Sequence, residues 1–331
     1  MCRRHIAVTT AAFVLASPAV CAAQAPALDA PPALPTDSAA YGASGFRLAV
    51  LMQVRADFFQ SGDDTGTFLL RKAEVGIRAR VASRAHLSIE LDPVRPSDPL
   101  RRTYLRLAPF DRLHVKLGME KSPIGLEELL SSATVPFVDR SEVSDRFAAA
   151  EEVGVHLESH LDRWILQLSV TNGGRRLVRD DNRAKDVAAR IAWAPLPALS
   201  IGAAGLVGKA GATSEDRVRL NGEMRLGSGD SGVLAEYFDA KDAEVRSHAF
   251  AVGAFHALET GSTRIPQVQP VLRYEHLDRD DDVEDEELRL LTAGLSILFD
   301  GHRSKLQANY LWDLREAATR GDVRVQYQVE F

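Results

Sequence analysis

The sequence predicts an all-β fold, a transmembrane antiparallel β-barrel of about sixteen strands, and two features of the chain lead to it. First, apolar and polar residues alternate nearly everywhere after Gly45. Because successive side chains of a strand point to opposite faces, each segment has one apolar and one charged face. Second, these segments are about ten residues long, as lipid-spanning strands are, whereas strands of a soluble sandwich usually have about five or six.

The strand segments and their connections support a closed barrel. With both chain ends on the periplasmic side, the connections after even-numbered strands should be short, and most are. An even number of strands is what bacterial barrels need. The predicted strands lie near 45–59, 68–82, 85–92, 100–108, 112–119, 151–159, 162–171, 186–194, 198–208, 217–226, 231–239, 244–257, 267–277, 286–299, 304–315 and 321–331.

The N-terminus has the pattern of a secretory signal peptide at 1–23. A basic start precedes an apolar run, and small residues follow it up to Ala23, after which we expect cleavage. The run is short for a membrane anchor, and the valine before Cys21 disfavours a lipoprotein. The Ala- and Pro-rich stretch at 24–44 is expected to be a flexible leader. The barrel is predicted to occupy 45–331.

Composition and motifs argue against several other functions. The net charge of −6 gives no nucleic-acid footprint. Both cysteines lie in the predicted signal peptide, so the mature chain is expected to lack disulfides and catalytic thiols. No serine box places a nucleophile beside a histidine, and His156 and His160 lie too far apart on a strand for a compact metal site. We therefore expect no enzyme activity, no metal and no cofactor.

One connection, at 120–150, is much longer than the others. A long loop in a compact domain is usually functional. GLEELLSS at 125–132 is the only stretch of the chain with a helical pattern. We expect this loop to fold inward and to narrow the lumen as a constriction loop.

If the apolar faces meet lipid, the inward faces of the first five strands are rich in basic residues. Arginine presents a planar fork that matches phosphate oxygens, and rings of positive charge favour anions in a pore. The alternative is that wall charges merely pair across strands, as Arg78 and Glu90 might. The inward basic residues are Arg47, Arg55, Lys72, Arg78, Arg80, Arg102, Arg106 and Lys116, against Asp57, Glu74, Glu90 and Asp92.

Several of these segments resemble the phosphate-selective porin O and P family. They are LLRKAEVGIRARV at 69–81, the run from TYLRL to FVDRS at 103–141, EEVGVHLESH at 151–160 and WILQLSVTNGG at 164–174. The sequence departs from the family pattern at Ile124, where phenylalanine is usual. The resemblance implies a trimeric, sixteen-stranded outer-membrane porin that passes anions, in some members phosphate.

The resemblance also implies roles for single residues. Lys121 matches the lysine of the family's loop motif, and Arg71 and Lys72 match the paired basic residues of its second strand. We expect Lys121 and Lys72 to face water at the constriction, and Arg71 to reach the lumen only if the strand bulges there. The candidate anion-binding residues are Arg71, Lys72, Arg78, Arg80, Lys116, Lys121 and Arg140.

The expected partners follow from the same resemblance. They are small anionic solutes, outer-membrane lipid and lipopolysaccharide, two further copies of the chain, and the barrel assembly machinery, which recognises a terminal aromatic such as Phe331. We expect the chain in the outer membrane of a Gram-negative bacterium. The acidic run at 278–287 either binds divalent cations that bridge lipopolysaccharide or is a solvated outer loop. A non-selective diffusion porin and a non-conducting structural barrel remain as alternatives.

Overall fold

A computed structural model describes residues 45–59, 66–173, 184–210, 215–281, 283, 287–315 and 321–331. The predicted signal peptide and leader lie outside these described residues. The described part contains seventeen strands and two short helices. Neither described helix has the length and apolar character needed to cross a membrane.

The element bounds agree with the predicted segments. The strands are β1 (Phe46–Phe58), β2 (Thr67–Ala82), β3 (Ala85–Leu91), β4 (Thr103–Phe110), β5 (Leu113–Lys121), β6 (Glu151–Leu161), β7 (Trp164–Thr171), β8 (Asp186–Leu196), β9 (Leu199–Ala210), β10 (Glu215–Ser228), β11 (Ser231–Asp242), β12 (Val245–His256), β13 (Leu258–Glu259), β14 (Gln267–Asp278), β15 (Glu287–Asp300), β16 (Ser304–Asp313) and β17 (Gly321–Glu330). The helices are α1 (Leu126–Leu129) and α2 (Glu142–Phe147).

The strands form one closed antiparallel sheet. Each strand pairs with its neighbours in the chain, and β1 also pairs with β17, from Leu51 opposite Glu330 to Phe58 opposite Val323. The two-residue β13 pairs with β14 beyond the end of β12, so the barrel has sixteen strand positions. The predicted barrel of about sixteen strands is confirmed. Closure leaves no free edge, which lipid requires because it offers no hydrogen-bond partners.

The burial pattern is that of a barrel with an apolar exterior. On β1, Phe46, Met52 and Phe58 are between 46% and 52% exposed. On the opposite face of the same strand, Gln53 and Asp57 are only 1% and 4% exposed. A soluble domain would bury the first set and expose the second. The period-two alternation therefore separates an outer apolar wall from a polar inner wall.

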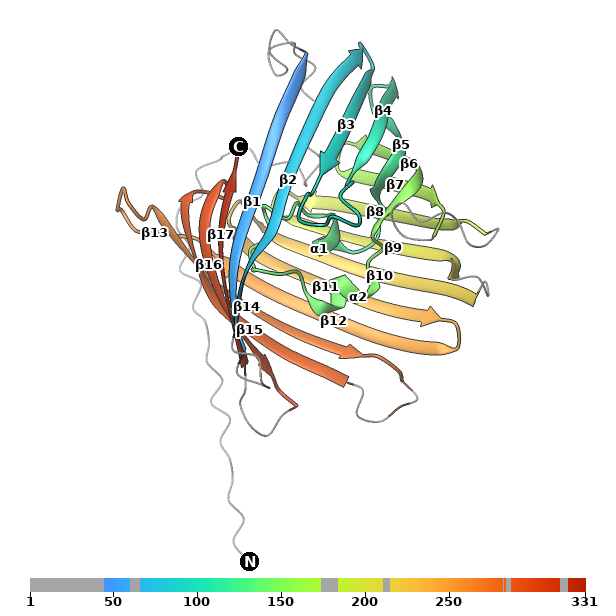
Figure 1. Ribbon diagram of the computed structural model, residues 1–331. Helices are drawn as coiled ribbons and strands as arrows, with labels where there is room; N and C mark the ends of the chain where they lie inside the picture. Colours follow the sequence, from blue (N-terminus) through green and yellow to red (C-terminus); the bar gives the residue numbers. More distant parts are fainter. Residues whose placement is uncertain are drawn as a thin grey trace, which may run out of the picture.

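The long connection between β5 and β6 folds into the lumen, as predicted. It carries both helices, which lie within the ring of strands (Figure 1). Its apolar side chains pack on an apolar part of the inner wall, where Phe147 stacks on Phe238 with ring centroids 5.7 Å apart. A second cluster places Phe137 against Leu234 and near Gly253, where a side chain would meet the ring at 2.9 Å. These contacts fix the loop across the lumen.

Helix α2 was not predicted, so the expectation of a single helical stretch is wrong. Ser141 begins the helix, and its side chain accepts a hydrogen bond from the Ser144 amide at 3.0 Å. Only Val143 and Phe147 of this short helix form an apolar i,i+4 pair, too little for a periodic signal. The serine cap is the local signal that marks the helix.

Candidate functional site: the charged lumen

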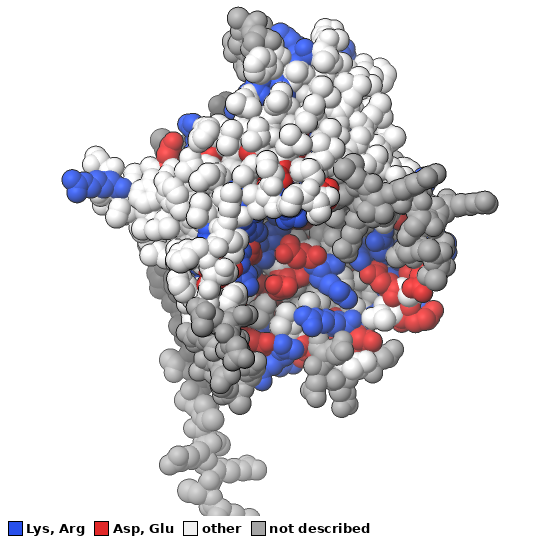
Figure 2. Space-filling model, viewed as in Figure 1, with Lys and Arg blue, Asp and Glu red and all other residues white. Residues whose placement is uncertain are grey.

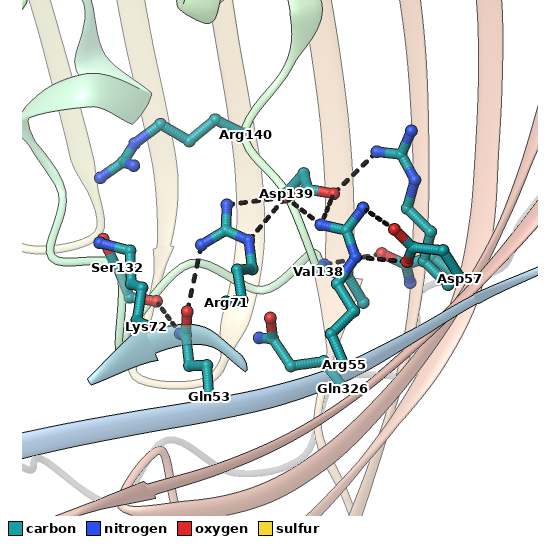
Figure 3. Close-up of polar contacts among 12 residues, drawn as sticks. Gln53, Arg55, Asp57, Arg71, Lys72, Ser132, Val138, Asp139, Arg140 and Gln326 are labelled. Carbon is teal, nitrogen blue, oxygen red and sulfur yellow. Dashed lines mark hydrogen bonds and ion pairs between the residues drawn. The ribbon is translucent and has the colours of Figure 1, made fainter. Parts of the chain in front are cut away.

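The centre of the site is the Asp139 cluster, in which the inward loop meets the wall. The Asp139 carboxylate accepts hydrogen bonds from Arg55 of β1 at 2.8 Å, Arg71 of β2 at 2.7 Å and Arg324 of β17 at 2.7 Å. Figure 3 shows Arg55 and Arg71 converging on Asp139. Arg55 also donates to Asp57 at 2.7 Å. The loop is thus attached to three strands on both sides of the barrel closure.

Arg71 reaches this cluster because β2 bulges. Gln53 of β1 pairs with Lys72 and Val54 pairs with Leu70, so Arg71 is the extra residue. A bulge shifts the side-chain alternation by one position. The Arg71 guanidinium consequently enters the lumen, where it also donates to the Gln53 side chain at 3.1 Å. Arg71 was expected to reach the lumen only if the strand bulges at this position, and β2 does bulge there.

The Asp139 carboxylate is charged at neutral pH. Burial raises its pKa, but Arg71, Arg55 and Arg324 outweigh that effect and hold the pKa below its ordinary value. The Asp139 side chain is 14% exposed, so water at the lumen screens these attractions only in part. With three arginines against Asp139 and Asp57, the cluster retains one net positive charge.

Lys121 and Arg140 hold the loop together instead of facing open water. Lys121 donates to the Leu130 carbonyl at 3.2 Å and to the Glu128 carbonyl. Arg140 donates to the Glu127 carbonyl at 2.8 Å and to the Leu130 carbonyl at 2.9 Å. The physical reason is that a four-residue helix such as α1 leaves its last carbonyls without partners. The expected exposure of Lys121 is therefore wrong, because its side chain is only 8% exposed.

Lys72 and Lys116 are also buried, in ion pairs. The Lys72 ammonium bonds to Glu74 of the wall and to the Ser132 hydroxyl of the loop at 2.9 Å, and Lys72 is 4% exposed. The expectation that Lys72 faces water is wrong, because Glu74 and the Ser132 hydroxyl of the loop enclose its ammonium group. Lys116 lies between Glu120 at 3.0 Å and Glu158 at 3.3 Å. Lys72 therefore connects wall and loop, whereas Lys116 joins two neighbouring wall strands, β5 and β6.

Arg78 and Arg80 belong to a different group of basic residues, which we call the basic row. It lies near the short connections, such as the one that joins β2 to β3. Strand pairing sets Arg47 opposite Arg78, Arg80 opposite His86, His86 opposite Arg106, and Arg106 opposite Lys116. Two of these pairs, Arg47 with Arg78 and Arg106 with Lys116, set like charges directly opposite each other, which destabilises a sheet. A row of basic residues on a lumen wall therefore lowers the stability of the sheet. Since rings of positive charge favour anions in a pore, this row indicates a role in binding or passing anions.

Cross-strand pairing does not neutralise the start of the row. Among the described residues, the side chains of Arg47 and Arg78 have neither a hydrogen bond nor an ion pair. Glu90, which was a possible partner of Arg78, instead pairs with Arg102 at 2.8 Å. Arg78 lies opposite Ser88 on β3. Its charge is therefore available to the lumen.

The lumen also carries acids, so both signs are present at its visible mouth. Figure 2 shows blue and red side chains gathered in the hollow, whereas the neighbouring outer wall is mostly white. The loop places Glu142 and Asp145 on its exposed side together with Arg146. The pore wall is thus a mixed field in which the basic row and the Asp139 cluster supply the excess of positive charge on β1 to β5.

Sequence reasoning missed one central residue, Asp139. It identified the inward direction of Arg55 and the candidate residues Arg71 and Arg140, but not the carboxylate that joins the arginines. The available signal was the acid that precedes Arg140 in FVDRS. An acid at that place, in a loop expected to face arginines, points to an ion pair.

A closed antiparallel barrel with an apolar exterior and a charged lumen narrowed by an inward loop is an outer-membrane porin. The sequence model of the family described as phosphate-selective porin O and P matches residues 49–230, and the chain belongs to this family. The comparison with curated proteins gave no match.

Solved structures agree on the fold. Salmonella typhi OmpF in complex with daunomycin superposes with a TM-score of 0.65 at 10% identity, covering 86% of this chain and 97% of that one. The trimer form of OmpT, an outer-membrane protein of Vibrio cholerae, gives 0.61 at 11%, with 86% and 99% covered. An anion-selective porin from Comamonas acidovorans gives 0.61 at 12%, with 86% and 99% covered. At these identities the likeness shows the fold alone.

Proposed function

We propose that the protein is an anion-preferring porin for phosphate or other small anionic solutes. The observation that carries this proposal is the basic row, in which Arg47 lies opposite Arg78 and Arg106 opposite Lys116, with no acid paired to Arg47 or Arg78 within the described residues. The anion-selective porin from Comamonas acidovorans has the same fold and supports the proposed anion preference by analogy.

The expected size of the effect follows from Coulomb attraction. One unit charge about 4 Å from an anion contributes about 1 kcal/mol in a water-like medium, which is about a fivefold local enrichment. Several cations in one row act together, since a Debye length of about 8 Å at physiological salt spans neighbouring strands. A preference of anions over cations by several-fold is therefore expected.

Charge reversal in the basic row tests the proposal. The variants R47E and R78E remove cations that have no partner in the described structure, so the barrel is expected to fold normally. The matched control is R84E, which changes an exposed arginine in the turn after β2, outside the lumen. In a salt gradient across a planar bilayer, R78E should move the reversal potential toward cation preference and R84E should not. Equal reversal potentials of wild type, R47E and R78E would contradict the proposal.

The two alternatives give different recordings. A non-selective diffusion porin would show conductance steps with a reversal potential near zero in the gradient, and R78E would leave it unchanged. A non-conducting structural barrel would show no steps from folded protein. Inorganic phosphate that blocks the chloride current at millimolar concentration would support phosphate as a permeating anion.

The assembly and location of the protein are part of the same proposal. We expect a homotrimer in the outer membrane of a Gram-negative bacterium, in contact with lipid and lipopolysaccharide, after cleavage at Ala23 and insertion by the barrel assembly machinery. The trimer form of the structurally similar OmpT supports the oligomeric state by analogy. Native mass determination in detergent and N-terminal sequencing of the mature protein test these points.

A further inference from the structure

A cluster outside the lumen has the chemistry of a metal site. His248 of β12 lies opposite Asp278, the last residue of β14, and Asp281 follows in the connection to β15. One ligand atom from each of these three residues lies within 4.8 Å of the others. By strand alternation, His248 and Asp278 point away from the lumen, because their neighbours Ser247, Ala249 and Leu277 are buried inside. The site therefore lies on the outer wall, at the barrel end opposite the short turns.

One oxygen of the cluster lacks a partner. The Asp278 Oδ1 atom is buried and has no hydrogen bond within the described structure. Burying a carboxylate oxygen without a partner is costly. A bound cation would satisfy this oxygen, and neither His248 nor Asp281 does so at present.

The neighbouring arginine leaves room for a metal ion. Arg246 lies 3.0 Å from Asp239 but 4.0 Å from Asp281, so its closer ion pair is with Asp239. The Asp281 carboxylate can therefore still coordinate another cation. The His248 Nδ1 atom lies 2.8 Å from an Asp281 oxygen, which shows that the two groups already approach each other.

We propose that His248, Asp278 and Asp281 bind a divalent transition-metal ion, with zinc as the simplest probe. One imidazole and two carboxylates are ligands that zinc accepts, whereas calcium needs six to eight oxygens. Zinc bonds of about 2.0–2.2 Å in a tetrahedron set ligand atoms roughly 3.4 Å apart. The present ligand atoms lie within 4.8 Å of one another, so each pair would have to approach by at most about 1.4 Å to reach that spacing. The ion would fasten the end of β14 and the connection after it to β12.

Zinc titration of the purified, folded full-length protein without a histidine tag tests the proposal. Isothermal calorimetry should show one saturable zinc site per chain for the wild type. H248A and D278N should weaken this binding at least tenfold. The matched control H256A removes an exposed histidine from the other end of β12 and should bind zinc like the wild type. Gel heat-modifiability confirms that each variant is folded.

Three results would overturn the site. They are the absence of saturable zinc binding by the folded wild type, zinc binding by H248A and D278N equal to the wild type, or an equal loss in H256A. Cobalt gives an independent readout, because its visible absorption reports ligation and should disappear in H248A. The site lies outside the lumen, so H248A should keep the wild-type reversal potential, and the outcome is independent of the proposed anion preference.

Discussion

The replacement D139N should weaken the attachment of the inward loop to β1, β2 and β17, because the arginine of each strand loses its countercharge. Asparagine keeps one acceptor oxygen, so the contact of Arg324 at 2.7 Å and one contact of Arg55 at 2.8 Å lose the oxygen that they share. Breaking a buried ion pair costs about 3–5 kcal/mol, and partial exposure to lumen water reduces this to about 2 kcal/mol. The population of detached loop should then rise about thirtyfold, since each 1.4 kcal/mol is a factor of ten.

Single-channel recording measures this effect. D139N should show frequent transitions between conductance levels and a stronger anion preference, because the three arginines lose their countercharge. The matched control E142Q removes one negative charge from the exposed side of the same loop without touching the cluster. E142Q should change selectivity modestly and leave the current steady. If D139N and E142Q give equally steady currents, Asp139 does not anchor the loop.

Three further predictions concern pH, packing and closure. The pKa of Asp139 is lowered, so its contribution is present above the unfolded value of about 3.9 and is lost as pH falls through the lower folded value. Wild-type currents should therefore remain steady from pH 7 to 5 and fluctuate only under strongly acidic conditions. F137A removes a ring that is 1% exposed, should cost about 3–5 kcal/mol of packing, and should make the loop cleavable by trypsin. Deleting Phe331 removes its two backbone hydrogen bonds to Val50 and should lower the yield of heat-modifiable barrel; an unchanged yield would contradict this.

Much of the fold could be predicted because side chains alternate between the two faces of a strand, so that every second residue is apolar. The apolar face of β1 is visible from Phe46 to Phe58 without knowledge of any partner strand. The bulge at Arg71 breaks this rule locally, and only the pairing of Gln53 with Lys72 reveals it. The length of the connection after β5 was enough to predict that it enters the lumen.

The contacts of the site could not be predicted in the same way, because they join residues far apart in the chain. Asp139 is 68 positions from Arg71 and 185 from Arg324, and no spacing rule connects them. The burial of Lys121 has a local cause, the unpaired carbonyls of α1, but it becomes apparent only when the loop is folded. Residue type and face were predictable, whereas the choice of partners depended on tertiary packing.

The central claim, an anion-preferring pore, is tested most directly by the reversal potential of the wild-type protein in a tenfold potassium chloride gradient. The folded, purified chain is inserted into a planar bilayer, and the zero-current voltage is read from single channels. The basic row predicts a voltage displaced toward the chloride equilibrium potential. A voltage near zero, or one displaced toward the potassium equilibrium potential, would contradict the claim.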